Sequence, residues 1–186
     1  GLGSGAGEQL AAELTVRMSK ELSERYGVAE GRRLTEKTLR LLLEVDQELA
    51  ARIARSPRAL DGAVYLGKHG IKNDMLSGAL GHPVFRDPRY TQVDYLEDVE
   101  TIVSRNSNVT GLQENVAKLF SDKTPEAGYA FEVRVAAERA ERGNLHGISV
   151  GERKVVLSEG AVPSVRVDVD VWADSEFIQV KRSWRA

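Results

Sequence analysis

The chain has no cysteine and only three histidines among its 186 residues. The lack of cysteine excludes a disulfide framework, a zinc finger and a cysteine nucleophile. Three scattered histidines leave little room for a histidine-rich metal site. The sequence also contains no GxxxxGK[ST] or GxGxxG segment, so nucleotide binding by those glycine-rich loops has no support.

Long apolar runs and an excess of either charge are also lacking. No run approaches the roughly 18 residues of a membrane-spanning helix and no signal peptide opens the chain, so we do not expect an integral membrane protein. The formal net charge is −2, and a nucleic-acid partner would therefore need a local basic patch. With 41% hydrophobic and 29% charged residues, the chain has the composition of a globular protein with a sizeable core.

Hydrophobic residues recur at helical spacing through much of the first two thirds of the chain. The spacing predicts helices over residues 8–26, 35–56, 93–104 and 112–120. Thr110 is the expected N-cap of the last of these helices.

The segments between and before these helices lack the helical spacing of hydrophobic residues. Residues 62–92 are dense in glycine and proline, which predicts a loop with one short strand at 63–66. The glycine-rich residues 1–7 resemble a linker or cloning remnant. A turn near residues 121–128 then gives the best internal boundary, so that 8–122 forms a mainly helical N-terminal region.

After this boundary the pattern changes from helical to alternating. Residues 129–142 predict a helix, and the alternation of branched and polar residues then predicts four short strands, at 145–150, 154–157, 164–172 and 177–181. We therefore expect an α+β fold in which the N-terminal helical region is followed, in residues 123–186, by a helix and a small mixed β-sheet.

The informative polar residues lie on the last two predicted strands. Asp168 and Asp170 share one face of their strand because side chains alternate. A hairpin would bring Gln179 and Lys181 to the same face. Oxygen ligands of this kind suit Mg²⁺, and a neighbouring lysine can orient a water or neutralise charge developing on phosphorus. Glu132, early in the preceding helix, would add a carboxylate if that helix packs across the sheet.

The same pattern also fits an ordinary half-exposed hairpin. Alternating valine and charge is typical of such hairpins, in which Asp168 and Asp170 would form ion pairs with Arg166 or Lys154 in solvent. The spacing alone does not choose between a metal site and a solvated surface.

Residues 128–181 resemble the PD-(D/E)XK nuclease superfamily, which has the restriction-endonuclease-like fold. The family pattern is a helix with an early glutamate, a strand ending in aspartate, and then Glu or Gln, any residue and Lys on the next strand. The corresponding segments are Gly-Tyr-Ala-Phe-Glu-Val at 128–133, Val-Asp-Val-Asp-Val-Trp at 167–172 and Gln-Val-Lys at 179–181.

This resemblance implies a site and a reaction. Glu132, Asp170 and Gln179 would surround one or two Mg²⁺ ions, with Mn²⁺ as a substitute metal, and Lys181 would be the catalytic lysine. Asp168 is the second choice for the metal-binding aspartate. Gln179 stands where an acidic residue is commoner. The reaction would be hydrolysis of a phosphodiester by a metal-activated water.

Basic residues near this motif suggest a surface for nucleic acid. Arg153 and Lys154 lie on a preceding strand, and Arg182 and Trp184 follow Lys181. Together they would hold a phosphate backbone and stack a base. Ordinary surface charge explains these residues equally well.

Within the superfamily, small domains that follow an unrelated helical segment resemble the C-terminal toxin domains of bacterial contact-dependent inhibition systems. Such a toxin would be delivered from a secreted or surface parent protein, cut DNA or tRNA in the cytoplasm, and be neutralised by an immunity protein. A resolvase, restriction or repair nuclease fits the same residues, and those usually act as dimers. A different class is a nuclease-like binding domain without catalysis.

Overall fold

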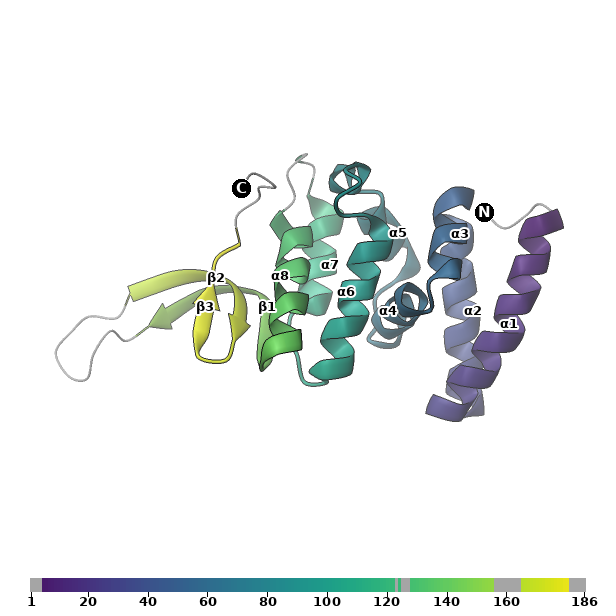
Figure 1. The fold of residues 1–186 in the computed structure, drawn as a ribbon, viewed down its shortest axis with the longest axis horizontal. Coiled ribbons are helices and arrows are strands. Elements are labelled where there is room, and N and C mark those ends of the chain that lie inside the picture. The colour runs from purple at the N-terminus through teal and green to yellow at the C-terminus, as the bar shows by residue number, and fades with distance from the viewer. Residues whose placement is uncertain (1–4, 123, 125–127, 156–164, 181–186) are drawn as a thin grey trace.

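The structure is a computed structural model that describes residues 5–122, 124, 128–155 and 165–180 (Figure 1). Within these ranges it is an α+β protein, with α-helices, one 3₁₀ turn at Pro83–Arg86 and a small sheet. The helices are α1 (Gly5–Tyr26), α2 (Val28–Glu44), α3 (Gln47–Arg55), α4 (Pro57–Lys68), α5 (Asn73–Leu80), α6 (Gln92–Arg105), α7 (Leu112–Ser121) and α8 (Gly128–Arg142). None of these helices is both long and apolar enough to cross a membrane.

Four of the five predicted helices are confirmed, as α1, α6, α7 and α8. Helix α1 begins at Gly5, inside the segment expected to be a linker, and buries the predicted stripe through Leu14, Met18 and Leu22. Helix α6 begins with a capping box, in which the Thr91 hydroxyl accepts from the Asp94 N–H and the Asp94 carboxylate accepts from the Thr91 N–H. In α6 the apolar periodicity and the cap chemistry therefore agree.

The single helix expected over residues 35–56 is wrong. The chain forms two helices there, because Asp46 caps a new start and its Oδ1 accepts from the Leu49 N–H at 2.8 Å. Thr35 lies inside α2 rather than at its start, and its hydroxyl donates to the Gly31 carbonyl at 2.7 Å.

The loop expected over residues 62–92 is also wrong, since that stretch contains most of α4, all of α5 and the 3₁₀ turn. Pro57 occupies the first turn of α4, and the Ser56 hydroxyl caps it by accepting from the Ala59 N–H at 3.1 Å. Gly62 permits close packing, because a Cβ at this position would overlap the main-chain carbonyl of Leu96 on α6. Glycine here serves helix packing and not a turn.

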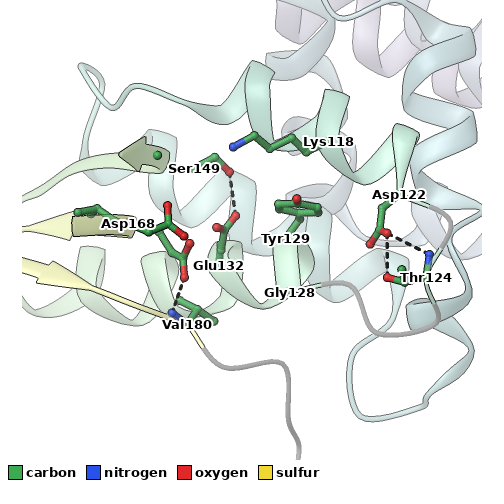
Figure 2. Close-up of a pocket in the computed structure, with 12 residues that line it drawn as sticks. Lys118, Asp122, Thr124, Gly128, Tyr129, Glu132, Ser149, Asp168 and Val180 are labelled. Atoms are coloured by element: carbon green, nitrogen blue, oxygen red, sulfur yellow. Dashed lines mark hydrogen bonds between the residues drawn. The ribbon is translucent and has the colours of Figure 1, made fainter. Parts of the chain in front are cut away.

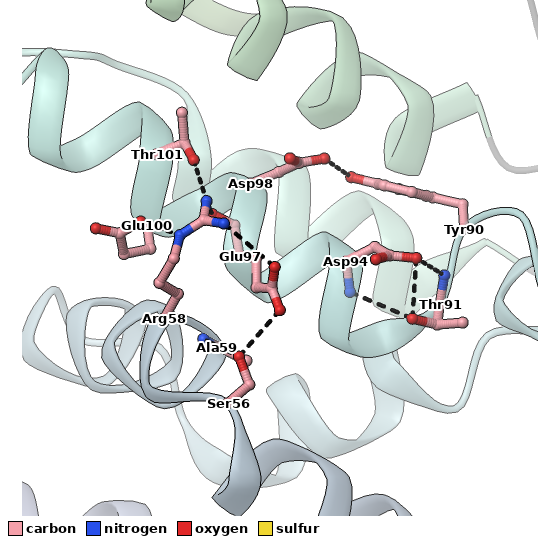
Figure 3. A network of polar contacts seen from close by, with 10 residues as sticks. All are labelled: Ser56, Arg58, Ala59, Tyr90, Thr91, Asp94, Glu97, Asp98, Glu100 and Thr101. Carbon is pink, nitrogen blue, oxygen red and sulfur yellow. Dashed lines mark hydrogen bonds and ion pairs between the residues drawn. The ribbon is translucent and has the colours of Figure 1, made fainter.

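A polar network ties α4 to α6 beside this close contact (Figure 3). The Arg58 guanidinium donates from Nε to Glu100 at 3.0 Å and from Nη1 to Glu97 at 3.3 Å, and it also bonds the hydroxyl of Thr101. The Ser56 hydroxyl donates to the other carboxylate oxygen of Glu97 at 3.0 Å. Each acidic group in this network therefore has a donor.

The sheet consists of β1 (Leu145–Val155), β2 (Val165–Ala173) and β3 (Glu176–Ile178), in the order β1-β2-β3. Both pairings are antiparallel, so the expectation of a mixed sheet is wrong for the described strands. The predicted hairpin between the last two strands is confirmed. The separate strands expected at 145–150 and 154–157 are wrong, because β1 runs on through an irregularity at residues 149–150, where Ser149 has a φ of 50°.

The apolar core continues from the helices into the sheet. Helix α8 lies between α6 and α7 on one side and the sheet on the other (Figure 1), and buried residues form one cluster from Leu14 to Ala173. Thr110 does not cap α7. Its N–H donates to the His146 carbonyl at 3.1 Å and its carbonyl accepts from Ile148 at 2.9 Å, which joins the start of α7 to β1. The proposed boundary near residue 123 therefore crosses a shared core.

Candidate functional site

A pocket of about 380 Å³ opens where α7, α8, β1 and β2 meet (Figure 2). Its polar lining comes from all four elements, with Lys118 on α7, Glu132 on α8, Ser149 on β1, and Asp168 and Asp170 on β2. Three of the residues expected to hold a metal thus line one pocket. The helical region contributes to the pocket as well, which the sequence did not indicate.

Glu132 is the most buried acidic side chain of the pocket, with an exposed fraction of 4%. The Ser149 hydroxyl donates to its Oε2 at 2.8 Å, and Asn115 Nδ2 lies 3.2 Å from the same oxygen. Burial raises the pKa of Glu132 to about 8, the Ser149 hydrogen bond opposes this rise, and the charge of neighbouring Asp170 adds to it. The Asp170 carboxyl group therefore lies close enough to Glu132 to disfavour the ionisation of Glu132.

Asp170 lies at an irregular point of the sheet. Its strand neighbours Val169 and Val171 pair with β1, while Asp170 faces the irregular residues 149–150. Beyond the end of β3 the main chain stays close, since the Val180 N–H donates to Asp170 Oδ2 at 2.7 Å. The break in regular pairing gives this carboxylate room to approach α8.

The other predicted ligands lie less centrally. Asp168 lines the pocket with an exposed side chain. Gln179 is exposed and does not line the pocket, and its Nε2 donates to the main-chain carbonyl of Asp168 at 3.0 Å. Lys181 lies outside the described residues. Of the predicted set, the structure brings Glu132 and Asp170 into contact, with Asp168 at the rim.

Most of the predicted basic patch falls outside the described residues. Arg153 is exposed, does not line the pocket, and donates from Nη1 to the carbonyl of Glu152 at 3.0 Å. The side chain of Lys154, together with Arg182 and Trp184, falls outside the described residues. The nucleic-acid surface therefore stays a prediction, as does the alternative that Asp168 and Asp170 pair with Arg166 or Lys154.

Two residues of α7 were missed by sequence reasoning. Asn115 is fully buried against Glu132. Lys118 is exposed, reaches the pocket, and lies with its Nζ 5.7 Å from the centre of the Tyr129 ring, where its charge lowers the pKa of Glu132. The sequence did contain an indication that Asn115 is buried and bonded. It falls on the apolar stripe formed by Leu112 and Val116, where a polar side chain needs a hydrogen-bond partner.

The donor set fits a hard cation. In the described parts of the chain no three His, Cys, Asp or Glu side chains converge in a metal-binding arrangement, so the candidate centre rests on Glu132 and Asp170. Mg²⁺ commonly keeps several waters and takes only one or two protein carboxylates. A divalent charge beside Glu132 would offset the burial and the neighbouring carboxyl group that raise its pKa.

Comparisons of this chain with protein-family models, with curated proteins and with solved structures find no match. The chemistry of the pocket is therefore the basis on which function is inferred.

Proposed function

We propose that this chain is a metal-dependent nuclease of the PD-(D/E)XK type that hydrolyses phosphodiester bonds of DNA or tRNA. The observation that supports it best is the contact between Glu132 and Asp170, which come from α8 and β2 and share one pocket. None of the described cationic side chains forms an ion pair with either of them. Burying a carboxyl group beside a second one is costly, and such groups concentrate at functional sites.

The roles of the chain's own residues follow from this geometry. Glu132 and Asp170 would hold Mg²⁺, which would supply an activated water and neutralise charge on the phosphate. Asp168, at the pocket rim, would contact the hydrated ion, and Lys118 would face the anionic phosphate from α7. Lys181, one residue beyond the Val180 N–H that binds Asp170, keeps the role of catalytic lysine that the motif implies.

The biological setting remains part of the proposal. The helical region before the motif favours a toxin that acts in the cytoplasm after delivery by a larger parent protein, with an immunity protein as its partner. The second candidate is a nuclease-like binding domain without catalysis. Gln179 favours it, because its amide donates to the Asp168 main chain and does not line the pocket.

Cleavage of plasmid DNA and of total tRNA, each with Mg²⁺ or with EDTA, tests the proposal. We expect Mg²⁺-dependent cleavage of at least one substrate, and its loss in Asp170→Ala and Lys181→Ala. Glu141→Ala, an exposed carboxylate near the end of α8, is the matched control and should cleave like the unmodified chain.

The outcomes separate the candidates. The substrate that is cut identifies the class of nucleic acid. No cleavage by the folded chain would favour the binding domain. Cleavage that survives both substitutions would show that the reaction uses another site.

A further inference from the structure

We infer that Asn115 of α7 is a positioning residue that holds the Glu132 carboxyl group in the orientation needed to bind the metal. This inference rests on the proposed function and extends the site into the helical region, to which the nuclease motif assigns no role.

Both the oxygen and the nitrogen of the Asn115 side-chain amide form hydrogen bonds. Its Nδ2 lies 2.8 Å from the Tyr129 carbonyl, 3.1 Å from Ser149 Oγ and 3.2 Å from Glu132 Oε2. The Tyr95 hydroxyl donates to its Oδ1 at 2.8 Å. An amide nitrogen has two hydrogens, so one serves Tyr129 and the other is shared between Ser149 and Glu132.

The Tyr129 carbonyl fixes which way the amide faces. A carbonyl only accepts, so the opposite orientation would set Oδ1 against it, whereas the observed orientation gives the carbonyl a donor and leaves Oδ1 to accept from the Tyr95 hydroxyl. Tyr95 and Asn115 are both fully buried, so water cannot replace the missing bonds. Nδ2 is thereby held toward Glu132, and the chain of contacts runs from α6 through α7 to α8.

Asn115 and Ser149 both contact Glu132 at the same oxygen atom. Both Asn115 Nδ2 and the Ser149 hydroxyl approach Oε2, while the neighbouring carboxyl group is that of Asp170. Two donors at one oxygen restrict the rotation of a side chain that has several rotatable bonds. The second carboxyl oxygen is then directed to the Asp170 side of the pocket, where a cation would bind.

A role of this kind predicts weaker metal binding and not only lower stability. Partners that orient metal ligands typically contribute about 10- to 100-fold to metal affinity. We therefore expect Asn115→Leu, which keeps a similar volume but has no donor, to raise the half-saturating Mg²⁺ concentration for cleavage at least about tenfold. Tyr95→Phe should raise it less, by roughly two- to fivefold, because Asn115 then keeps its donors but loses its anchor.

The experiment measures two quantities for each folded variant: the Mg²⁺ dependence of cleavage, and Mn²⁺ binding by calorimetry without nucleic acid. Leu49→Ala on α3 is the control, since it removes a buried side chain from a helix that does not line the pocket. It should lower the melting temperature and leave both metal measurements unchanged. Asn115→Ala replaces Asn115→Leu if the latter does not fold.

Weaker Mn²⁺ binding in the Asn115 and Tyr95 variants, with unchanged binding in the control, would support the inference. Unchanged metal binding in the Asn115 variant, in a chain that itself binds Mn²⁺ and cleaves, would overturn the inference alone. An unmodified chain that neither binds Mn²⁺ nor cleaves would overturn the proposed function and this inference together.

Discussion

Two regions of the molecule hold acidic side chains that are at least partly buried, and the groups that surround those side chains differ. At the α4–α6 contact, Arg58 bonds both Glu97 and Glu100, and nearby Asp98 accepts from the Tyr90 hydroxyl at 2.6 Å (Figure 3). In the pocket, the donors that reach Glu132 are neutral and its neighbour is another carboxyl group. Arg58 compensates the charges of Glu97 and Glu100, which serves packing, whereas Asp98 resembles Glu132 in being buried with a neutral hydroxyl donor. What sets Glu132 apart is that its neighbour is the Asp170 carboxyl group, an arrangement that favours a cation.

The largest expected effect comes from removing the charge in each region. Glu132→Gln should lower Mg²⁺-dependent cleavage at least about a thousandfold, because a neutral amide is a poor replacement for a metal-binding carboxylate. Asp98→Asn, the equivalent change in the other region, should leave cleavage within about twofold. Initial cleavage rates at matched Mg²⁺ concentrations test this contrast. Equal losses in the two variants would mean that the regions do not differ in function.

The burial of Asp98 should make the stability of the folded chain depend on pH. Burial raises the pKa of Asp98 from 3.8 to about 7, although the Tyr90 hydrogen bond and Arg134 oppose the rise. The folded chain thus binds this proton more tightly than the unfolded chain, and stability is lost as pH rises from about 4 to about 7. Each pKa unit corresponds to about 1.4 kcal/mol, so the loss amounts to up to about 4 kcal/mol.

Urea unfolding across this pH range, in EDTA, measures the effect. The free energy of unfolding of Asp98→Asn should fall less steeply with pH than that of the unmodified chain. Because the pKa of Glu132 is also raised, part of the fall should remain in Asp98→Asn. Parallel curves for the two proteins would show that Asp98 ionises at its ordinary pKa.

The Arg58 network should contribute to stability without affecting cleavage. Arg58→Leu leaves Glu97, Glu100 and Thr101 without their shared donor, and we expect a loss of about 1–2 kcal/mol, since Arg58 is partly exposed. Thermal unfolding and cleavage assays on the same samples separate the two quantities. A cleavage defect larger than twofold in the folded variant would contradict the structural role.

The smallest effect is expected at the start of α6, the helix that carries Tyr95 and Asp98. Thr91→Ala removes the hydroxyl half of the capping box and should cost about 1 kcal/mol. Chemical denaturation measures it, with Thr91→Ser as the control that keeps the hydroxyl. If Thr91→Ser loses as much stability as Thr91→Ala, the hydroxyl is not what stabilises the helix start.

Glu132 and Asp170 were nominated mainly by the resemblance of residues 128–181 to a short nuclease motif. Strand alternation alone places Asp168 and Asp170 on one face without choosing between them, and Glu132 contributes only if its helix packs across the sheet. Asn115 and Lys118 were missed because their approach to the pocket depends on how α7 packs against α8, which no local spacing records. Gln179 was placed on the correct hairpin, but the end of β3 directs its amide to the main chain.

The incorrect predictions of the fold have a similar physical origin. Glycine and proline in residues 62–92 were read as signals for a loop, but Gly62 allows two helices to touch and Pro83 starts a 3₁₀ turn. Both residues have more than one use, and only the three-dimensional neighbours decide between them. Where the apolar period is long and unbroken, as in α1 and α6, the sequence was sufficient.

The continuous core has a consequence for how this chain can be recombined with others. A crossover near residue 123 would look natural by composition, yet it would detach α8 from the helices that share its buried face and separate Glu132 from Asn115. A chimaera that carries the motif intact should include α6 and α7 from the same parent. The segment that would have to be transferred is therefore longer than residues 128–181, which carry the motif.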